Sequence, residues 1–317
     1  HETYKGRLRP RSHYALGWLP RWGRLITAIP GLGSLVNLLG KAPVVGQLLR
    51  WGAGVDQRRD IPRFANRPAK KQLKAIKDAA APARKGEVLV WVDSFSDCFE
   101  SNNFTAVVKV LVELGWEPRV LSRPACCGLS WISTGQLDGA RREITRAAAE
   151  LAPWAERGIP IVGVEPSCTA VWSGDAHELV PGDPNVQSLK GKVLTLAQFL
   201  AKDPDFVAPD LTGQVIVAQP HCHHASVIGW EEDAQLLAAT GADVRRIGGC
   251  CGLAGNFGAE KGHHEVSVKV YESNLGPAVT NAGEDAIVLA DGFSCQTQLK
   301  AMAGRDSMSL AELLATH

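Results

Sequence analysis

The sequence has no uninterrupted run of about 18 apolar residues, the length that a membrane-spanning helix needs. Its opening, HETYKGRLRPRSHY, contains no apolar h-region, so a secretory signal peptide is not expected either. Without such a signal, disulfide bonds are not the expected use of its cysteines. The first residue is His1 rather than Met, and we therefore expect the chain to be part of a longer protein.

The chain has almost no net charge, +1 at pH 7, but this value conceals two oppositely charged regions. Residues 1–85 contain 18 Lys and Arg and only 4 Asp and Glu, whereas residues 86–317 contain 16 basic and 29 acidic residues. The basic region is expected to contact its own acidic body, an anionic membrane surface or an acidic partner domain. No nucleic-acid-binding motif accompanies the charge, so nucleic acid is not expected as a partner.

Residues 1–86 are predicted to form a basic helical arm that leads into a linker. Trp, Leu and Arg recur along residues 14–51, and three prolines divide this stretch into short helices: Pro20, Pro30 and Pro43. We expect these helices to lie on a neighbouring domain, with a membrane interface as the alternative. The polar stretch 52–86 is expected to contain one helix near residues 68–80.

From residue 87 onward, short apolar runs alternate with amphipathic helical patterns. Strands are expected at residues 87–93, 117–122, 159–168, 213–222, 242–249 and 285–295, and helices at 102–115, 139–158, 231–241 and 262–283. This alternation predicts an α/β fold with parallel or mostly parallel sheets.

All eight cysteines repeat at a nearly fixed spacing. Three recur 124 positions later and the fourth recurs 127 positions later, which pairs Cys98, Cys126, Cys127 and Cys168 with Cys222, Cys250, Cys251 and Cys295. No cysteine is left over, and this regularity points to a duplication. We therefore predict two similar lobes, residues 87–205 and 206–317.

Three interpretations of these cysteines compete: disulfides, buried structural thiols, and ligands of a metal or cluster. Each lobe has an adjacent Cys-Cys pair, and neighbouring Cα atoms about 3.8 Å apart are too close for standard disulfide geometry. A free cysteine is often a small buried hydrophobic residue, but a core role does not explain eight cysteines in register. Ligation is preferred, because loops at the carboxyl ends of strands meet in one crevice of an α/β sheet.

Four thiolates suit either a [4Fe–4S] cluster or tetrahedral zinc. Short C-x2-C pairs, typical of structural zinc, are absent from the sequence, which favours a cluster and leaves zinc as the alternative. Gly128 and Gly252 follow the two Cys-Cys pairs and allow backbone N–H groups to approach sulfur. We expect the four sulfurs of each lobe to lie within a few ångströms of a common point.

Two further residues are candidates for cofactor binding. His223 follows Cys222 and could ligate a metal, bond to a cluster sulfur or relay a proton, the alternative being a loop histidine without such a role. Asn256, in the loop GLAGNFG, is expected to line the second site. Acidic residues next to the cysteines could couple proton uptake to reduction, namely Asp97, Glu165 and Asp291, although for Glu165 a role in shaping the loop is preferred. No catalytic residue is predicted on this chain.

A resemblance to a known family rests on five motifs: RPACCGLSWISTGQLD, GIPIVGVEPSC, QPHCHHASVIGW, GGCCGLAGNFG and DGFSCQTQL. They resemble the cysteine-rich CCG domain, which occurs in one subunit of heterodisulfide reductase, in the iron-sulfur subunits of glycolate oxidase and anaerobic glycerol-3-phosphate dehydrogenase, and in lactate-utilisation proteins. Together with the opening KGRLRPRSHYALGWLP, they look like the C-terminal iron-sulfur region of large FAD-linked oxidases, such as D-lactate and D-2-hydroxyglutarate dehydrogenases.

The resemblance implies that the chain is the electron-transfer part of an oxidoreductase. A flavin domain would oxidise a 2-hydroxy acid, and iron-sulfur clusters would pass electrons toward a quinone or another acceptor. The eight cysteines would be the ligands, with at most one cluster in each lobe. FAD and a ferredoxin-type module would lie on another domain or subunit, since neither a flavin-binding domain nor a C-x2-C-x2-C motif is found here. The chain would be cytoplasmic and peripheral on the inner face of the plasma membrane.

The chain departs from the five-cysteine form of the motif, which ends in C-x2-C. Glu165 and Gly292 stand at the positions of the additional cysteines, which weighs against a non-cubane cluster and favours a four-thiolate site. Two other functions stay open. One is a zinc-stabilised scaffold that only docks a catalytic domain. The other is a thiol/disulfide-reducing site of the heterodisulfide reductase type, although the missing fifth cysteine argues against it.

Overall fold

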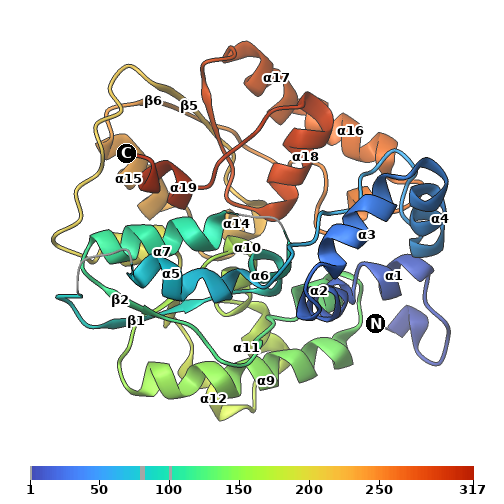
Figure 1. Cartoon of the computed structure of the whole chain (residues 1–317), viewed down its shortest axis with the longest axis horizontal. Helices are drawn as coiled ribbons and strands as arrows, with labels where there is room; N and C mark the ends of the chain where they lie inside the picture. The colour runs from blue at the N-terminus through green and yellow to red at the C-terminus, as the bar shows by residue number, and fades with distance from the viewer. Residues whose placement is uncertain (1, 79–82, 100–101) are drawn as a thin grey trace.

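A computed structural model of the chain describes residues 2–78, 83–99 and 102–317. The fold is α/β, with one parallel sheet in each of two lobes and a helical arm before them (Figure 1). The predicted fold class is therefore confirmed. The boundaries after residues 86 and 205 stay predictions. All strands of the first sheet lie before residue 205, and all strands of the second sheet lie after it.

Short helices form the arm, as its prolines predict. α2 (Leu19–Ala28) has Pro20 in its first turn and α4 (Pro43–Ala53) begins at Pro43, where a missing N–H costs no helical hydrogen bond. The other helical segments of the arm are η1 (Glu2–Tyr4), α1 (Arg11–Ala15), α3 (Leu32–Lys41), η2 (Ala69–Gln72) and α5 (Leu73–Asp78). The helix predicted near residues 68–80 corresponds to η2 and α5, and its last two residues lie outside the described residues.

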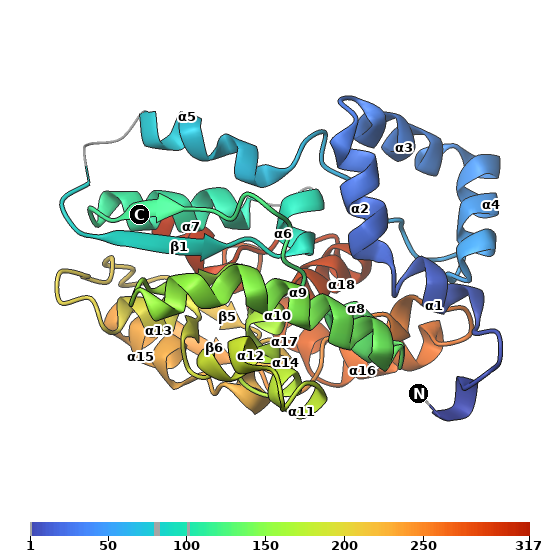
Figure 2. The same cartoon turned by 90° about the horizontal axis from the view of Figure 1, so that it is seen from below.

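The basic arm packs on the acidic body, which is one of the predicted alternatives. Arg21 of α2 forms an ion pair with Glu143 at 2.8 Å, and Arg58 pairs with Glu265 at 2.7 Å, so the arm contacts both lobes. α3 and α4 lie at one end of the molecule (Figures 1 and 2). Of the described helices, none is alone long and apolar enough to cross a membrane, and α3 and α4 pass that test only as a pair bent by 100°.

The first lobe contains a four-stranded parallel sheet in the order β2-β1-β3-β4. Its strands are β1 (Glu87–Trp91), β2 (Glu117–Arg119), β3 (Ile161–Gly163) and β4 (Val193–Leu194). Leu89 of the central strand β1 pairs with Arg119 on one side and Ile161 on the other. The helices of this lobe are α6 (Ser94–Cys98), α7 (Asn103–Glu113), α8 (Leu129–Ser133), α9 (Leu137–Glu156), α10 (Pro166–Val171), α11 (Asp175–Leu179), α12 (Pro184–Ser188) and α13 (Leu196–Leu200).

The second lobe repeats this arrangement with a three-stranded parallel sheet in the order β6-β5-β7. Its strands are β5 (Val215–Ala218), β6 (Asp243–Arg246) and β7 (Ile287–Leu289). The helical segments are α14 (Cys222–Val227), α15 (Glu231–Ala239), η3 (Phe257–Ala259), α16 (His264–Ser273), α17 (Leu275–Asn281), α18 (Phe293–Ala303) and α19 (Leu310–Ala315). In both sheets the first strand of the lobe is central and the second and third flank it, as expected for a duplication.

The structure differs from the predicted elements at several points, including one helix and one strand. The single helix expected at residues 262–283 is broken into α16 and α17 at Asn274, whose backbone (φ −143°, ψ −64°) leaves the helical region. The strand β4 is not predicted, because two residues are too few to show a period of two.

A large hydrophobic cluster crosses the two lobes. It contains Val88 and Phe104 from the first lobe together with Ile216 and Leu310 from the second. The last helix, α19, packs against α7 of the first lobe. The two sheets are therefore held together by a shared apolar core, and this fixes the relative positions of the two cysteine sets.

Candidate metal centre

All eight cysteines lie in the loops and short helices that follow the strands, and all are free thiols. In each lobe the first cysteine follows the central strand, the Cys-Cys pair follows the second strand and the last cysteine follows the third strand. Four of them are in helices rather than at strand ends as predicted: Cys98 in α6, Cys168 in α10, Cys222 in α14 and Cys295 in α18. The strands predicted to run into cysteines therefore end earlier, because the chain turns into a helix first.

The thiols of the second lobe form one connected set. Cys222 lies beside Cys250, and Cys251 lies beside both Cys250 and Cys295. The set reaches the surface, because Cys222 is exposed and Cys250 is half-buried, whereas Cys251 and Cys295 are buried. Four sulfurs from three separate loops are thus brought to one edge of the sheet.

Backbone amides after the second Cys-Cys pair point at its sulfurs. The Gly252 N–H donates to Cys250 Sγ at 3.3 Å, the Ala254 N–H bonds to the same sulfur, and the Leu253 N–H bonds to Cys251. Hydrogen bonds from Cys222 and Cys251, together with these amides, hold the pKa of Cys250 well below its usual range. The turn depends on a positive φ of +100° at Gly252, a conformation that residues with a Cβ rarely adopt.

The first lobe carries a similar but more deeply buried arrangement around its Cys-Cys pair. Cys126 and Cys168 both bond to Cys127, and the Leu129 N–H lies 3.5 Å from Cys127 Sγ. Gly128, with φ +80°, places its own N–H on Cys126. Both predicted glycines therefore stand where amides approach sulfur. The pKa of Cys127 is raised well above its usual value, because burial disfavours the thiolate.

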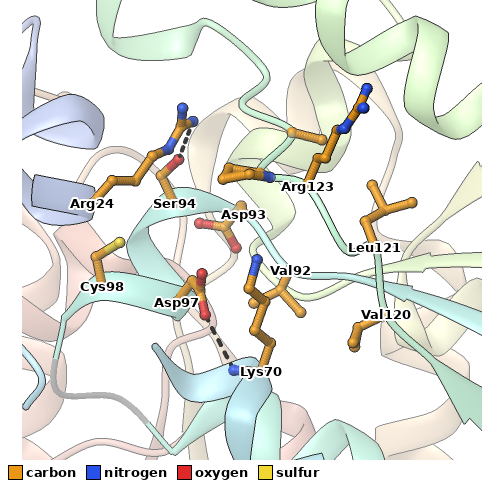
Figure 3. Close-up of a pocket in the computed structure, with 12 residues that line it drawn as sticks. Arg24, Lys70, Val92, Asp93, Ser94, Asp97, Cys98, Val120, Leu121 and Arg123 are labelled. Atoms are coloured by element: carbon orange, nitrogen blue, oxygen red, sulfur yellow. Dashed lines mark hydrogen bonds between the residues drawn. The ribbon is translucent and has the colours of Figure 1, made fainter. Parts of the chain in front are cut away.

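Cys98 stands apart from the other thiols of the first lobe. Burial and the neighbouring Asp97 raise its pKa to about 12, and its sulfur accepts a hydrogen bond from Thr27 Oγ1 of the arm at 3.8 Å. Figure 3 shows the pocket beside it, which Asp93 and Asp97 share with basic side chains, including Arg24, which donates to Ser94 Oγ at 3.2 Å. Cys98 thus lies between this polar pocket and a hydrophobic cluster with Phe64 and Phe99, and no other cysteine belongs to that cluster.

The donor set fits a metal or cluster by its chemistry, although it is not preassembled. Within the described residues, no group of three or more His, Cys, Asp or Glu side chains is arranged to hold a metal ion. The expected meeting of four sulfurs at one point is therefore not seen in either lobe. Thiolates stabilised by backbone amides are the ligands that an iron-sulfur cluster uses, so the four cysteines of each lobe fit such a group by their chemistry. The assignment of the eight cysteines as ligands stays a prediction.

The other two candidate residues make contacts away from the sulfurs. His223 connects α14 to the first lobe, with Nδ1 at 3.1 Å from the Ser167 carbonyl oxygen and Nε2 at 3.1 Å from Asp175 Oδ2. The Asn256 side-chain amide donates to Glu260. These contacts give both residues a role in positioning loops, and their predicted part in cofactor binding stays a prediction.

Buried carboxyl groups follow three of the strands at this edge. Asp93 follows β1 and caps α6 by accepting from the Phe95 N–H at 2.7 Å. Glu165 and Asp291 follow β3 and β7, and burial raises their pKa values to about 8 and about 6. Asp93 is not among the residues predicted from the sequence, although an acid directly after an apolar strand is a visible signal. The structure places Asp97 at the end of α6, beside Cys98.

Comparison with protein families identifies the two cysteine-bearing segments. The family model of the cysteine-rich domain CCG matches residues 93–172 and 231–300. The first match contains all four cysteines of the first lobe, and the second contains Cys250, Cys251 and Cys295 but begins after Cys222.

Several curated proteins are similar to the chain over most of its length. It is 28% identical to D-2-hydroxyglutarate dehydrogenase of Pseudomonas putida, over 96% of this chain and 30% of that protein. It is 24% identical to a subunit of the anaerobic glycerol-3-phosphate dehydrogenase of Escherichia coli, over 84% of this chain and 67% of that subunit. Lactate utilization protein A of Bacillus cereus is 25% identical, over 65% of this chain and 87% of that protein.

The chain thus spans less than a third of the length of the D-2-hydroxyglutarate dehydrogenases that it matches, 30% in Pseudomonas putida and 29% in Pantoea ananatis. The resemblance predicted from the cysteine motifs is confirmed by the matches to this domain and to these dehydrogenases. The chain therefore contains two segments, one in each lobe, that match the cysteine-rich CCG domain, and it resembles the iron-sulfur region of such oxidases.

Proposed function

We propose that this chain is the iron-sulfur electron-transfer module of a flavin-dependent 2-hydroxy acid dehydrogenase. The observation that carries the proposal is the meeting of thiols and backbone amides at the carboxyl edge of each parallel sheet, inside segments that match the CCG domain. A bound [4Fe–4S] cluster takes up and releases single electrons. The names of the relatives, D-2-hydroxyglutarate dehydrogenase above all, support a 2-hydroxy acid as the substrate of the whole enzyme.

The chain's own residues would hold the thiolates and set the electrostatic environment. The amides of Gly252 and Leu253 lie where they offset negative charge on sulfur. The buried cysteines would keep water away from one side of the site, while the exposed Cys222 leaves the other side open to a redox partner.

The partners in this proposal lie outside the chain. A flavin domain and a ferredoxin-type module would deliver electrons, either from the same full-length protein or from a separate subunit. The length of the relatives, of which this chain spans 30% or less in the D-2-hydroxyglutarate dehydrogenases, leaves room for both modules. A quinone or another carrier would accept the electrons.

We further propose that the chain works on the cytoplasmic side and is peripheral to the plasma membrane. Residues 3–55 contain eight Lys and Arg and no Asp or Glu. Large apolar side chains on α3 and α4 are exposed in the same segment, among them Leu38 and Val44 at 68% and Trp51 at 59%. Exposed apolar side chains on a basic surface are suited to the interface of an anionic membrane.

Metal and sulfide analysis tests the proposed electron-transfer function. The anaerobically purified chain would be assayed for iron, acid-labile sulfide and zinc, and its absorption spectrum recorded before and after reduction. Iron and sulfide in equal amounts, with an absorption that bleaches on reduction, would support the proposal. Stoichiometric zinc without sulfide would replace it with the scaffold function. Turnover of a disulfide substrate by the metal-free chain would replace it with a thiol-reducing function.

A further inference from the structure

The two cysteine sets differ in what covers them, and the difference is clearest at their first members. Cys98 and Cys222 are equivalent by the repeat spacing and by following the central strands β1 and β5. Cys98 is 1% exposed, whereas Cys222 is an exposed residue. The duplicated lobes have therefore diverged at the position where a cluster would meet solvent.

Helix α2 of the arm closes the first lobe directly over Cys98. A Cβ at Gly23 would lie 2.8 Å from Cys98 Cβ and 3.3 Å from its sulfur, so the helix backbone touches the cysteine with no space between. One turn further, Thr27 Oγ1 bonds to the sulfur at 3.8 Å. Phe64 and Phe99, with ring centroids 5.0 Å apart, belong to the same hydrophobic cluster as this thiol.

The arm also covers the helix that follows the first Cys-Cys pair. Ser130 Oγ of α8 donates to the Gly17 carbonyl oxygen at 2.9 Å. The Trp18 indole N–H donates to Gln136 at 2.9 Å, and Arg9 donates to the Thr134 carbonyl oxygen at 3.0 Å. These bonds hold the arm against α8 and the residues that directly follow it in the first lobe.

The corresponding segment of the second lobe is a loop rather than a helix: Ala254 and Gly255 are exposed, and the arm contacts the far end of the loop, where Arg59 donates to the Gly258 carbonyl oxygen. Ser130 corresponds to Ala254 by the repeat spacing, and Ala254 has φ +46°. Within the described residues it is the one non-glycine residue with a positive φ, a strained conformation of the kind that clusters at functional sites. With Gly252 and Gly255 also at positive φ, this loop forms a concave set of N–H groups, which is suited to an anion such as a thiolate-bound cluster.

The packing of the remaining thiols shows the same contrast. In the second lobe Cys250, Cys251 and Cys295 lie in one hydrophobic cluster. In the first lobe the four cysteines are distributed over three clusters: Cys98 with Phe64, Cys126 with Trp131, and Cys127 and Cys168 with the core around Trp172. Moving the first set to a common point would therefore disrupt three packed regions, whereas the second set has only one to rearrange.

We propose that the chain holds a single iron-sulfur cluster, on Cys222, Cys250, Cys251 and Cys295 of the second lobe, and that the arm seals the first lobe as a copy without a cluster. The inference rests on the proposed electron-transfer function and specifies its site. It assigns the arm a task as well, since α2 keeps the Cys98 thiol away from iron and from solvent.

Equivalent cysteine substitutions in the two lobes test the inference. Wild type and the variants Cys98→Ser, Cys222→Ser, Cys126→Ser and Cys250→Ser would be reconstituted anaerobically with iron and sulfide in the full chain. Iron, sulfide and visible absorption would be measured for each protein, with circular dichroism to confirm folding. We expect about four irons per chain in wild type. Cys98→Ser and Cys126→Ser would keep that content, while Cys222→Ser and Cys250→Ser would lose most of it.

Other outcomes overturn the inference in distinguishable ways. About eight irons in wild type, halved by a substitution in either lobe, would show two clusters and leave the proposed function intact. Loss of iron only in the first-lobe variants would place the cluster on the sealed side. No iron or sulfide in any protein, wild type included, would overturn the electron-transfer function itself.

Thiol alkylation of the metal-free wild-type chain gives an independent measurement if a first-lobe variant does not fold. Iodoacetamide labelling followed by peptide mass spectrometry would report each cysteine separately. We expect Cys222 to react at least tenfold faster than Cys98 and to be protected after reconstitution. Equal labelling of Cys98 and Cys222 would show that α2 does not seal the first lobe.

Discussion

Glu165 of the first lobe accepts a hydrogen bond from the Phe293 backbone N–H of the second lobe, at 3.1 Å through Oε2. Its other oxygen accepts from Ser167 at 2.8 Å. Glu165 stands where the five-cysteine motif has an additional cysteine, and Phe293 begins the helix that carries Cys295. The Glu165 carboxyl group thus joins the two cysteine-bearing edges.

This carboxyl group makes stability depend on pH. Burial, together with the nearby Asp93, raises the pKa of Glu165 from 4.5 to about 8, so the folded state holds a proton that the unfolded state releases. Its contribution to stability is complete below pH 4.5 and is lost as the pH rises toward 8. We expect the stability of Glu165→Gln relative to wild type to increase by roughly 3 kcal/mol as the pH rises from 5 to 8.

Urea unfolding of the metal-free chain at several pH values checks this expectation. Glu284→Gln, which changes an exposed carboxyl group, is the matched control, and its stability should run parallel to that of wild type. If the free energy of unfolding of Glu165→Gln followed that of wild type at every pH, Glu165 would be ionised in the folded protein. Another group would then stabilise its buried charge.

A second prediction concerns Arg59, whose guanidinium group anchors the arm to the second lobe. It donates to the Gly258 carbonyl oxygen at 2.8 Å, to Gln298 Oε1 at 2.7 Å and to Ser267 Oγ at 2.6 Å, and is 4% exposed. Arg59→Ala would leave the Gly258 carbonyl oxygen and Gln298 Oε1 without this donor, while Ser267 Oγ keeps the hydrogen bond from Gln298 Nε2, and should reduce the free energy of unfolding by about 2–4 kcal/mol.

Lys300→Ala is the comparison for this variant in the same urea titrations. Lys300 pairs with Asp306 at 2.6 Å, but both side chains are exposed. The loss of this ion pair should therefore reduce the free energy of unfolding by less than about 1 kcal/mol. A similar small loss for Arg59→Ala would mean that water replaces the guanidinium group and that the arm is not anchored there.

The sequence predicts the fold class and both cysteine sets because these depend on local patterns. Alternation of apolar runs and helical periods is present within each segment, and the repeat spacing alone identifies the equivalent positions of the two lobes. Glu165 can also be recognised from the sequence as a departure from the five-cysteine motif, because that motif is a local pattern too.

The covering of the first lobe is not visible in the sequence, because it depends on long-range packing. Gly23 is one of several glycines in the arm, and only its contact with Cys98 gives it a specific role. Arg59 is likewise one of many basic residues before the first strand, and its three partners all lie in the second lobe, far along the chain. The break at Asn274 has a similar origin, since an amphipathic pattern continues through it.

Binding to anionic vesicles tests the proposed membrane location. The full chain should sediment with vesicles of phosphatidylcholine and phosphatidylglycerol, less with phosphatidylcholine alone, and less again in high salt. Leu38→Asp with Val44→Asp should weaken binding at least about tenfold, because two apolar side chains no longer enter the interface. Val207→Asp, an exposed position at 83% outside the arm, should bind like wild type. Equal binding by all three proteins would contradict a membrane-facing arm.

The seal over Cys98 is tested by adding a single methyl group to α2. In Gly23→Ala the new Cβ would meet Cys98 Cβ at 2.8 Å, so α2 must lift from α6, at a cost of about 1–3 kcal/mol in the free energy of unfolding. Gly52→Ala makes the same change in α4 with no atom within 4 Å, and should stabilise the chain by about 0.5–1 kcal/mol. The displaced helix should also expose Cys98 to iodoacetamide in the first variant alone. Equal stability of wild type and Gly23→Ala, with Cys98 still unreactive, would show that α2 does not rest on this thiol.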